Sequence, residues 1–138
     1  MVINMVTLTD EMKEAIGTIQ VFPVATASKE GIPNVVPIGF VSLVDDSTIW
    51  IADNFMKKSL SNVMENPKVS IYIWGPKTKG SFQIKGDVEL KTSGPDFEKM
   101  QEIVHSKMAQ APAKSLLVMK ITDVYDCSPG PNAGEKLL

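Results

Sequence analysis

The stretch Ser81–Lys91 alternates apolar and polar residues more regularly than any other part of the chain. The residues at its even-numbered positions are Phe82, Ile84, Gly86, Val88 and Leu90. Successive side chains of a β-strand point to opposite faces of its sheet, so this pattern predicts a strand with one buried face and one wet face. A fold built around such a strand is expected to be mainly β and antiparallel, because only antiparallel sheets commonly leave one face in water.

Five further segments are rich in the β-branched and aromatic residues that favour strands. They are Gln20–Ser28, Asn34–Val44, Thr48–Ala52, Lys68–Trp74 and Ser115–Val124. Pro37 and Gly39 interrupt the second of these segments. Proline has no N–H for a central ladder, so we expect an edge strand or an interrupted strand there.

Three short segments have helical spacing of their apolar residues. The first spans Thr7–Thr18, where Thr7 is placed as the N-cap of a capping box. The second must stop near Asn66-Pro67, and the third opens at Pro95. Six strands and three helices without a repeating βαβ pattern predict a six-stranded antiparallel barrel with attached helices, in a single domain over residues 1–138.

All 14 basic residues are lysines, so the chain cannot bind phosphate or guanine through a planar guanidinium group. The net charge of −2 provides no broad attraction to nucleic acid or to an anionic membrane surface. The sequence also lacks the mixture of basic and aromatic residues typical of nucleic-acid-binding barrels. No apolar run approaches the ~18–20 residues that a membrane span needs. We therefore expect neither nucleic acid nor a membrane as a partner.

Cys127 is the only cysteine and His105 the only histidine, too few for an internal disulfide or a structural zinc site. We interpret Cys127 as a small packing or exposed thiol, since no resolving cysteine exists, and His105 as a surface or packing residue. A reducing cytoplasm is the simplest location. The stretch Met1–Leu8 has neither a charged leader nor a cleavage site, so we expect no signal peptide.

Lys57, Lys58 and Ser59 stand immediately before the second predicted helix. Unpaired N–H groups and the helix dipole already favour an anion at such a position. A phosphate could be held by the two ammonium groups, the hydroxyl and the first amides. The same residues are also compatible with an ordinary solvated helix start, and the local pattern does not distinguish the two.

A second candidate site is the segment Val35–Phe40, in which Pro37 lacks an N–H and Gly39 lacks a side chain. A flat ring could lie against this segment and form hydrogen bonds with exposed main-chain groups. The alternative interpretation is a bent strand without a ligand.

Several short motifs follow one another in a characteristic order. They are Val24–Pro33, Val36-Pro37-Ile38, Met56-Lys57-Lys58-Ser59 with Asn62, Asn66–Ser70, and Ile84-Lys85-Gly86. Over about residues 8–125, this order resembles the pyridoxamine 5′-phosphate oxidase-like family of FMN-binding split barrels. It is most similar to the small bacterial FMN-binding proteins, including the Gly94–Glu98 opening of the late helix.

The resemblance implies a split β-barrel that forms a homodimer with FMN in two clefts between the subunits. We expect no metal site, and no catalytic side chain is needed where FMN carries the chemistry. By the same resemblance, Lys57, Lys58 and Ser59 would hold the FMN phosphate. The remaining cofactor-binding residues would be Pro37, Ile38 and Gly39 at the ring edge, Ala52 and Asp53 lining the cleft, and Ser81, whose position often reaches the cofactor.

The sequence departs from the family pattern in two respects. Many relatives use arginine where this chain has Lys57 and Lys58, so the phosphate would be held with less geometric definition. The oxidase itself is longer and supplies arginine near the substrate phosphate from its C-terminal segment, whereas this chain ends in Gly134–Leu138. We therefore do not expect it to oxidise pyridoxine or pyridoxamine phosphate.

The leading functional hypothesis is a redox flavoprotein in which FMN transfers hydride or electrons between a donor and an acceptor that the sequence does not identify. Whether it is an oxidoreductase or a non-enzymatic electron carrier is left open. A binding module for a deazaflavin or for haem is a further alternative. Haem is disfavoured because only His105 could provide a nitrogen ligand.

Overall fold

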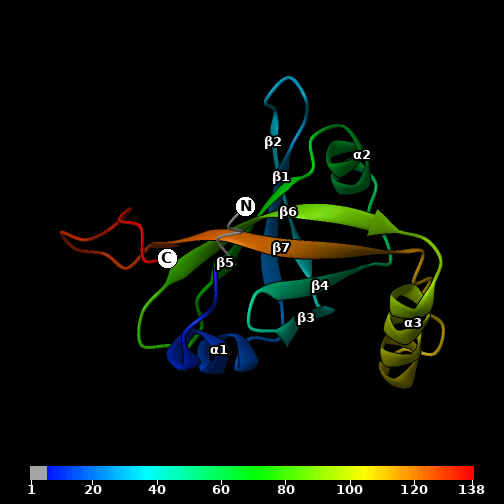
Figure 1. Cartoon of the computed structure of the whole chain (residues 1–138), viewed down its shortest axis with the longest axis horizontal. Coiled ribbons are helices and arrows are strands. Elements are labelled where there is room, and N and C mark those ends of the chain that lie inside the picture. Colours follow the sequence, from blue (N-terminus) through cyan, green and yellow to red (C-terminus); the bar gives the residue numbers. More distant parts are fainter. Residues whose placement is uncertain (1–5) are drawn as a thin grey trace, which may run out of the picture.

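The computed structural model describes residues 6–138, and its centre is one curled antiparallel sheet in the strand order β2-β1-β5-β6-β7-β4-β3 (Figure 1). The strands are β1 (Phe22–Ala27), β2 (Pro33–Ile38), β3 (Val41–Asp45), β4 (Thr48–Asp53), β5 (Lys68–Ile73), β6 (Phe82–Lys91) and β7 (Ser115–Asp126). The helices are α1 (Asp10–Gly17), α2 (Lys58–Glu65) and α3 (Pro95–Lys107). The expected mainly β antiparallel fold with three helices is confirmed.

The sheet has seven strands rather than the expected six, because the segment predicted as Asn34–Val44 forms two strands. β2 pairs with β1 at one edge of the sheet, whereas β3 pairs with β4 at the other edge. The chain changes partner at Gly39-Phe40, directly after Ile38. Pro37 pairs with Pro23 of β1, so neither residue can donate an N–H at this point of the ladder. The predicted interruption is confirmed, and the number of strands was wrong by one.

The sequence predicted Thr7 as the N-cap of the first helix, but α1 begins two residues later than that prediction. Thr9 is the N-cap, and its side-chain oxygen accepts the N–H of Met12 at 3.2 Å. Leu8 is buried, and its N–H donates to the carbonyl of Asp46 at 2.8 Å. This contact holds residue 8 in an extended segment against the β3–β4 turn and excludes it from the helix. Residues 1–5 lie outside the described residues, so the expectation for the N-terminal stretch is not tested.

The core lies on the concave side of the sheet and includes the predicted inner face of β6. Phe82, Ile84 and Gly86 are buried there, while Val88 and Leu90 are half-buried and pack at its border. Helices α1 and α2 contribute one buried apolar residue each. A smaller cluster joins α3 to β7, so the helices cover different parts of the sheet (Figure 1). Apolar side chains are buried on one face of β6 and on both faces of β4 and the first half of β7, and this burial stabilises the fold.

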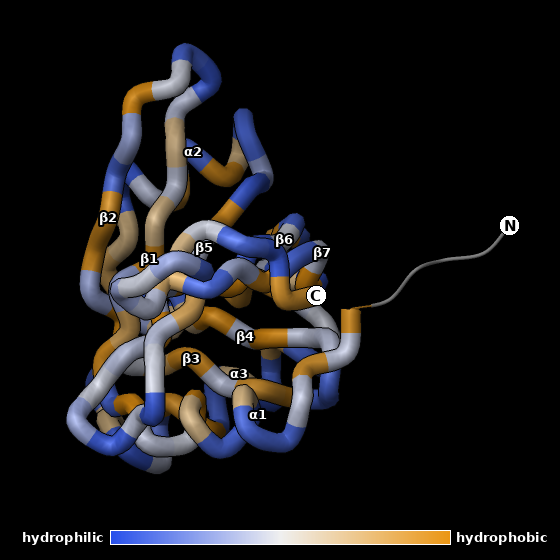
Figure 2. The backbone as a smooth tube through the Cα atoms, turned by 90° about the vertical axis from the view of Figure 1, so that its left-hand side faces the viewer, coloured by the Kyte–Doolittle hydropathy of each residue, from blue (hydrophilic) through white to orange (hydrophobic). Residues whose placement is uncertain are grey.

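The β1–β2 hairpin extends from the body of the sheet, and α2 lies beside it (Figure 2). Figure 2 also shows hydrophobic residues along β2, at the edge of the sheet. Within residues 6–138, no helix has both the length and the apolar character needed to cross a membrane.

Candidate functional site

A cavity of about 420 Å³ is bounded by β2 and the residues that follow it, by the β4–α2 loop and by the start of α2. We call it the α2 cavity. Its volume lies within the range of about 300–1,000 Å³ typical of small-ligand sites. The structure brings most of the predicted cofactor residues together here, from segments that are distant in sequence. They are Pro37, Ile38, Gly39, Ala52, Lys57, Lys58 and Ser59.

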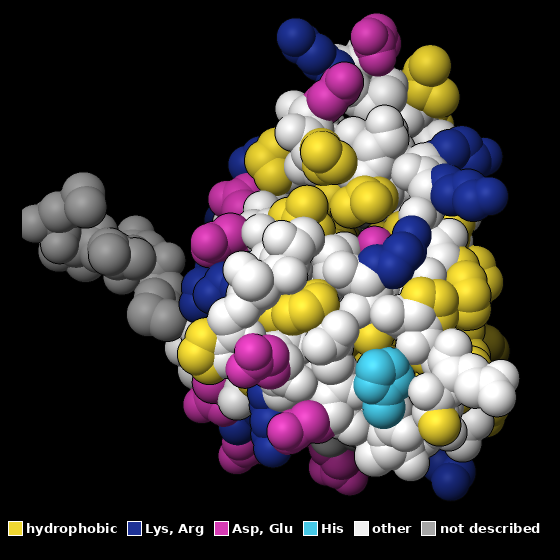
Figure 3. All heavy atoms as spheres, turned by 90° about the vertical axis from the view of Figure 1, so that its right-hand side faces the viewer, with side chains coloured by type: hydrophobic (Ala, Val, Ile, Leu, Met, Phe, Trp, Pro, Cys, Tyr) yellow, Lys and Arg dark blue, Asp and Glu magenta, His cyan; other side chains and the backbone are white. Residues whose placement is uncertain are grey.

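The start of α2 has the properties of an anion site. Lys57 is the N-cap residue, and no side chain caps the helix. The first amides of an α-helix have no acceptor within the helix, so the N–H groups of Lys58, Ser59 and Leu60 can bind a ligand, whereas that of Ser61 donates to the Lys57 carbonyl. Lys57 and Lys58 are exposed and form no ion pair within residues 6–138. Figure 3 shows lysine side chains beside exposed hydrophobic ones on the side of the molecule that carries α2 and α3.

The Ser59 hydroxyl is buried and is held in place by a polar network. Its Oγ accepts a hydrogen bond from Asn34 Nδ2 at 3.0 Å, which leaves the hydroxyl proton free to donate. Asn34 also donates to Thr26 Oγ1, and Asn62 of α2 donates to the same oxygen at 2.9 Å. The network therefore joins α2 to both strands of the hairpin.

Sequence reasoning missed the role of Asn34. Thr26 and Asn34 lie directly opposite each other in the β1–β2 register. A polar pair at facing positions of an otherwise apolar hairpin is the signal that could have identified it.

The part of the α2 cavity lined by the end of β2 is apolar, and one of its residues, Gly39, has no side chain. Gly39 has no positive φ, and a Cβ built on it would meet only the carbonyl oxygen of Gln20, at an ordinary contact distance of 3.9 Å. The packing of the chain therefore does not require glycine at this position. The absent side chain leaves room in the cavity beside Pro37 and Ile38. This geometry is suited to the close approach of a flat ligand.

The structure places the other two predicted cofactor residues away from the lining of the α2 cavity. Asp53 is completely buried beneath the β4–α2 loop, with 0% of its surface exposed. Ser81 is also buried, and it exchanges hydrogen bonds with Ser128: its N–H donates to Ser128 Oγ at 2.9 Å, and that hydroxyl reaches its carbonyl oxygen. Ser81 lines a different cavity, and its predicted contact with a cofactor stays a prediction.

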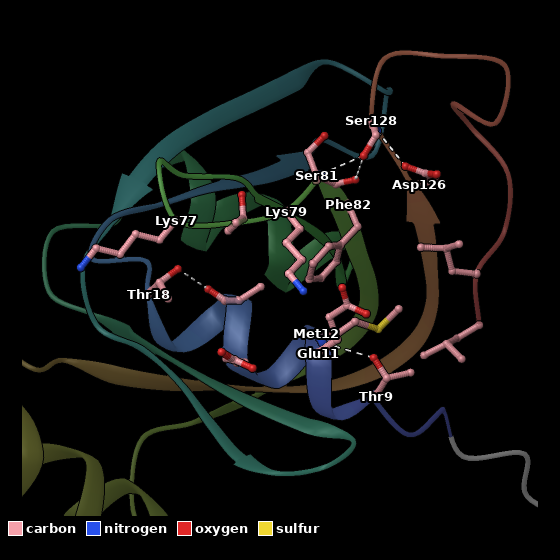
Figure 4. Close-up of a pocket in the computed structure, with 16 residues that line it drawn as sticks. Thr9, Glu11, Met12, Thr18, Lys77, Lys79, Ser81, Phe82, Asp126 and Ser128 are labelled. Atoms are coloured by element: carbon pink, nitrogen blue, oxygen red, sulfur yellow. Dashed lines mark hydrogen bonds between the residues drawn. The ribbon is translucent and has the colours of Figure 1, made fainter.

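The second cavity, which we call the α1 cavity, has a volume of about 530 Å³ and lies between α1, the turn before β6 and the C-terminal segment (Figure 4). Lys79 points toward α1 in this view, and Glu11 and Glu14 of α1 also line the cavity. Both signs of charge are therefore present, and the acidic first turn of α1 makes this cavity less suited to an anion than the α2 cavity.

His105 does not line either of these cavities. Its Nε2 lies 2.9 Å from the carbonyl oxygen of Ala111, a contact that ties the end of α3 to the segment before β7. No group of three or more His, Cys, Asp or Glu side chains in residues 6–138 is arranged to hold a metal ion.

Comparison of the sequence with protein-family models and with known proteins found a matching family and a relative. The model of the family described as pyridoxamine 5′-phosphate oxidase matches residues 8–128. An uncharacterised protein of Methanocaldococcus jannaschii is 36% identical over 134 residues, which cover 96% of this chain and 89% of that protein.

Solved structures with the same fold include proteins with different ligands. HupZ of Group A Streptococcus superposes with a TM-score of 0.79 and 26% identity, over 92% of this chain and 99% of that chain. An FMN-binding protein of Syntrophomonas wolfei gives a TM-score of 0.66 and 19% identity, over 83% and 81%. The haem storage protein HutZ of Vibrio cholerae gives 0.61 and 17%, over 88% and 95%. The last two similarities show the fold alone.

Proposed function

Because the chain belongs to the pyridoxamine 5′-phosphate oxidase family, we propose that it is a redox flavoprotein that binds FMN in the α2 cavity. One observation carries the proposal: a helix start with no side-chain cap and two lysines without an ion pair within residues 6–138 lines the same cavity as an apolar segment that lacks a side chain at Gly39. FMN combines a dianionic phosphate with a flat, largely apolar ring, so it matches both halves of the cavity. The FMN-binding protein of S. wolfei, which has the same fold, supports this choice.

The residues present fit this cofactor without further groups. Lys57 and Lys58 would neutralise the phosphate, and the Ser59 hydroxyl and the first amides of α2 would donate hydrogen bonds to it. Pro37 and Gly39 would lie along the edge of the ring. FMN itself supplies hydride or single-electron transfer when bound, while the protein orients it and limits its contact with water.

The reaction partner is a redox donor or acceptor that approaches the exposed side of the ring. Lysine presents a point charge rather than a planar fork, so this site would hold the phosphate less rigidly than an arginine site. With no arginine in the chain, we do not assign it the oxidation of pyridoxamine phosphate.

Cys127 is a free thiol, which fits a reducing cytoplasm as the location of the protein.

The proposal is tested by the absorption spectrum of the purified protein before and after FMN is added, with mass spectrometry of any released cofactor. We expect a flavin spectrum and a saturable stoichiometry of about one FMN per chain. A protein that binds neither native nor added FMN would contradict the proposal. Steady consumption of a nicotinamide donor with a small acceptor would identify an enzyme, whereas electron exchange with proteins alone would identify a carrier.

Titration with haem and with a deazaflavin cofactor provides the matched comparisons. Haem is a relevant competitor because the haem storage protein of V. cholerae has the same fold. We expect haem to bind more weakly than FMN, because the only histidine is engaged with Ala111 outside the α2 cavity.

We also propose that the protein is a homodimer whose second subunit covers the α2 cavity. Phe55 and Met108 line the cavity and are 74% and 48% exposed, and Val35 of the neighbouring edge strand is 64% exposed. Large apolar side chains grouped around a cavity typically mark an interaction surface. A second copy of the chain would remove them from water and shield the ring.

Substitution of Phe55 tests this arrangement. We expect the wild-type protein to sediment at about twice the 15.1 kDa of the chain, and Phe55→Asp to weaken dimerisation at least about tenfold, because a charge would be buried at the interface. Phe55→Leu keeps the site apolar and serves as the control. Analytical ultracentrifugation that finds a monomeric wild type, or equal dimerisation of both variants, would contradict the proposed interface.

A further inference from the structure

We propose that Asp53 is the positioning residue for the phosphate site: its buried carboxylate holds the loop Asp53–Lys57 in the shape that presents the start of α2, without contact with the cofactor. This inference rests on the proposed FMN site. It replaces the expectation that Asp53 lines the cleft, because the carboxylate is completely buried and does not line the α2 cavity.

Both oxygens of the carboxylate are used within the protein. Oδ1 accepts the N–H of Met56 at 2.9 Å, which closes the loop on itself. Oδ2 accepts the hydroxyl of Ser115 at 2.7 Å, at the start of β7. The hydrogen bond from Met56 determines the local turn, and the hydrogen bond from Ser115 ties this turn to β7, more than sixty positions later in the sequence. Together they orient the residue immediately before Lys57.

Lys114 completes the arrangement and balances the buried charge. Its Nζ lies 3.7 Å from Asp53 Oδ1 and donates to the carbonyl oxygen of Met56 at 3.2 Å. Its backbone N–H donates to the Asp53 carbonyl at 2.8 Å. Without this ammonium group, a carboxylate beneath an anion site would repel the phosphate. The pair therefore lets a negative charge organise the loop without opposing the ligand above it.

A further hydrogen bond, between Asn54 and Ala113, also connects the loop to the segment before β7. The side-chain oxygen of Asn54 accepts the N–H of Ala113 at 2.8 Å. Ala113 is buried and has a positive φ of 43°, a conformation that a non-glycine residue adopts only when its surroundings hold it there. The loop and this segment therefore form one rigid unit, which is suited to holding amides at fixed positions around an anion.

The experiment compares FMN with riboflavin, which has the same ring but no phosphate. We expect Asp53→Asn to raise the Kd for FMN by about tenfold or more, because the amide removes the charge paired with Lys114 and one acceptor of the loop. The Kd for riboflavin should change less than about twofold. A merely structural role would lower the affinity for both ligands equally.

Asp45→Asn is the matched control, because the Asp45 carboxylate also accepts a backbone N–H in a turn, from Ser47 at 2.9 Å, and does not line the α2 cavity. It should leave both Kd values unchanged. If Asp53→Asn fails to fold, Ser115→Ala removes one partner of the same carboxylate and should give a smaller loss with the same selectivity for FMN.

Two results would overturn the inference: unchanged FMN affinity in Asp53→Asn, or equal losses for FMN and riboflavin in a folded variant. Failure of the proposed function is a different result, since the wild-type protein would then bind neither flavin. Thermal melting of each variant, recorded without ligand, separates loss of the fold from loss of the phosphate site.

Discussion

Replacing Lys57 and Lys58 together by alanine is expected to weaken FMN binding by about 10²–10³-fold and to leave the melting temperature of the free protein nearly unchanged. A hydrogen bond to a charged group contributes about 1.5–3 kcal/mol, and exposure to solvent places both lysines at the low end of that range. Two such contacts amount to about 3–4 kcal/mol, which corresponds to the stated factor. Neither lysine forms an ion pair within residues 6–138, so the fold loses little.

The control is the double variant Lys77→Ala/Lys79→Ala. It removes the same charge from two exposed lysines of the α1 cavity and should leave FMN affinity unchanged. Isothermal titration at two salt concentrations provides the measurement, and the wild-type affinity should fall with rising salt because the contacts are ionic. Similar losses in the two double variants would show that net charge, rather than the start of α2, attracts the phosphate.

Gly86→Ala is expected to destabilise the protein by about 3 kcal/mol or more, the largest effect on folding that we predict for a single methyl group. A Cβ on Gly86 would lie 2.4 Å from the backbone carbonyl oxygen of Lys120 and 2.9 Å from the side chain of Met119. The side chain could move, but the carbonyl belongs to the β6–β7 ladder, where the register shifts between Lys85 and Gly86. Relief of the contact would therefore disrupt the ladder between two central strands.

Thermal melting of the purified variant measures this effect, and a fall in Tm of about 10 °C or more is expected for a chain of this size. Gly17→Ala is the matched control, since it adds the same methyl group at the end of α1, with no atom within 4 Å of the new Cβ. A Tm of Gly86→Ala within about 2 °C of the wild type would show that the ladder adapts to the extra atom.

Patterns that depend on neighbouring residues were predicted well from the sequence. The alternation over Ser81–Lys91 identified β6 and its buried face, because the side-chain period of a strand appears directly in the sequence. Lys57, Lys58 and Ser59 were predicted to stand immediately before a helix, and α2 begins at Lys58, because the features of a helix terminus lie within one turn. Pro37 and Gly39 predicted an interrupted or edge strand, since the missing N–H of proline is a property of that residue alone.

Features that depend on distant partners were not predictable in this way. Asn34–Val44 was predicted as one interrupted or edge strand rather than two strands, because nothing local shows that its halves pair with opposite edges of the sheet. The family resemblance implied that Asp53 lines the cleft, whereas in the structure it is buried and contacts Lys114 and Ser115. Its place could be known only after β4 and β7 had paired.

The sequence by itself therefore determined the β-rich fold class and the family, and it predicted a candidate anion site at the start of α2. Only the tertiary structure decided which residues share the α2 cavity, that Asp53 is buried and does not line it, and that Ser81 lines another cavity. Periodicity and helix termini are properties of adjacent residues. The direction and burial of a side chain depend on contacts between segments that the chain brings together only when it folds.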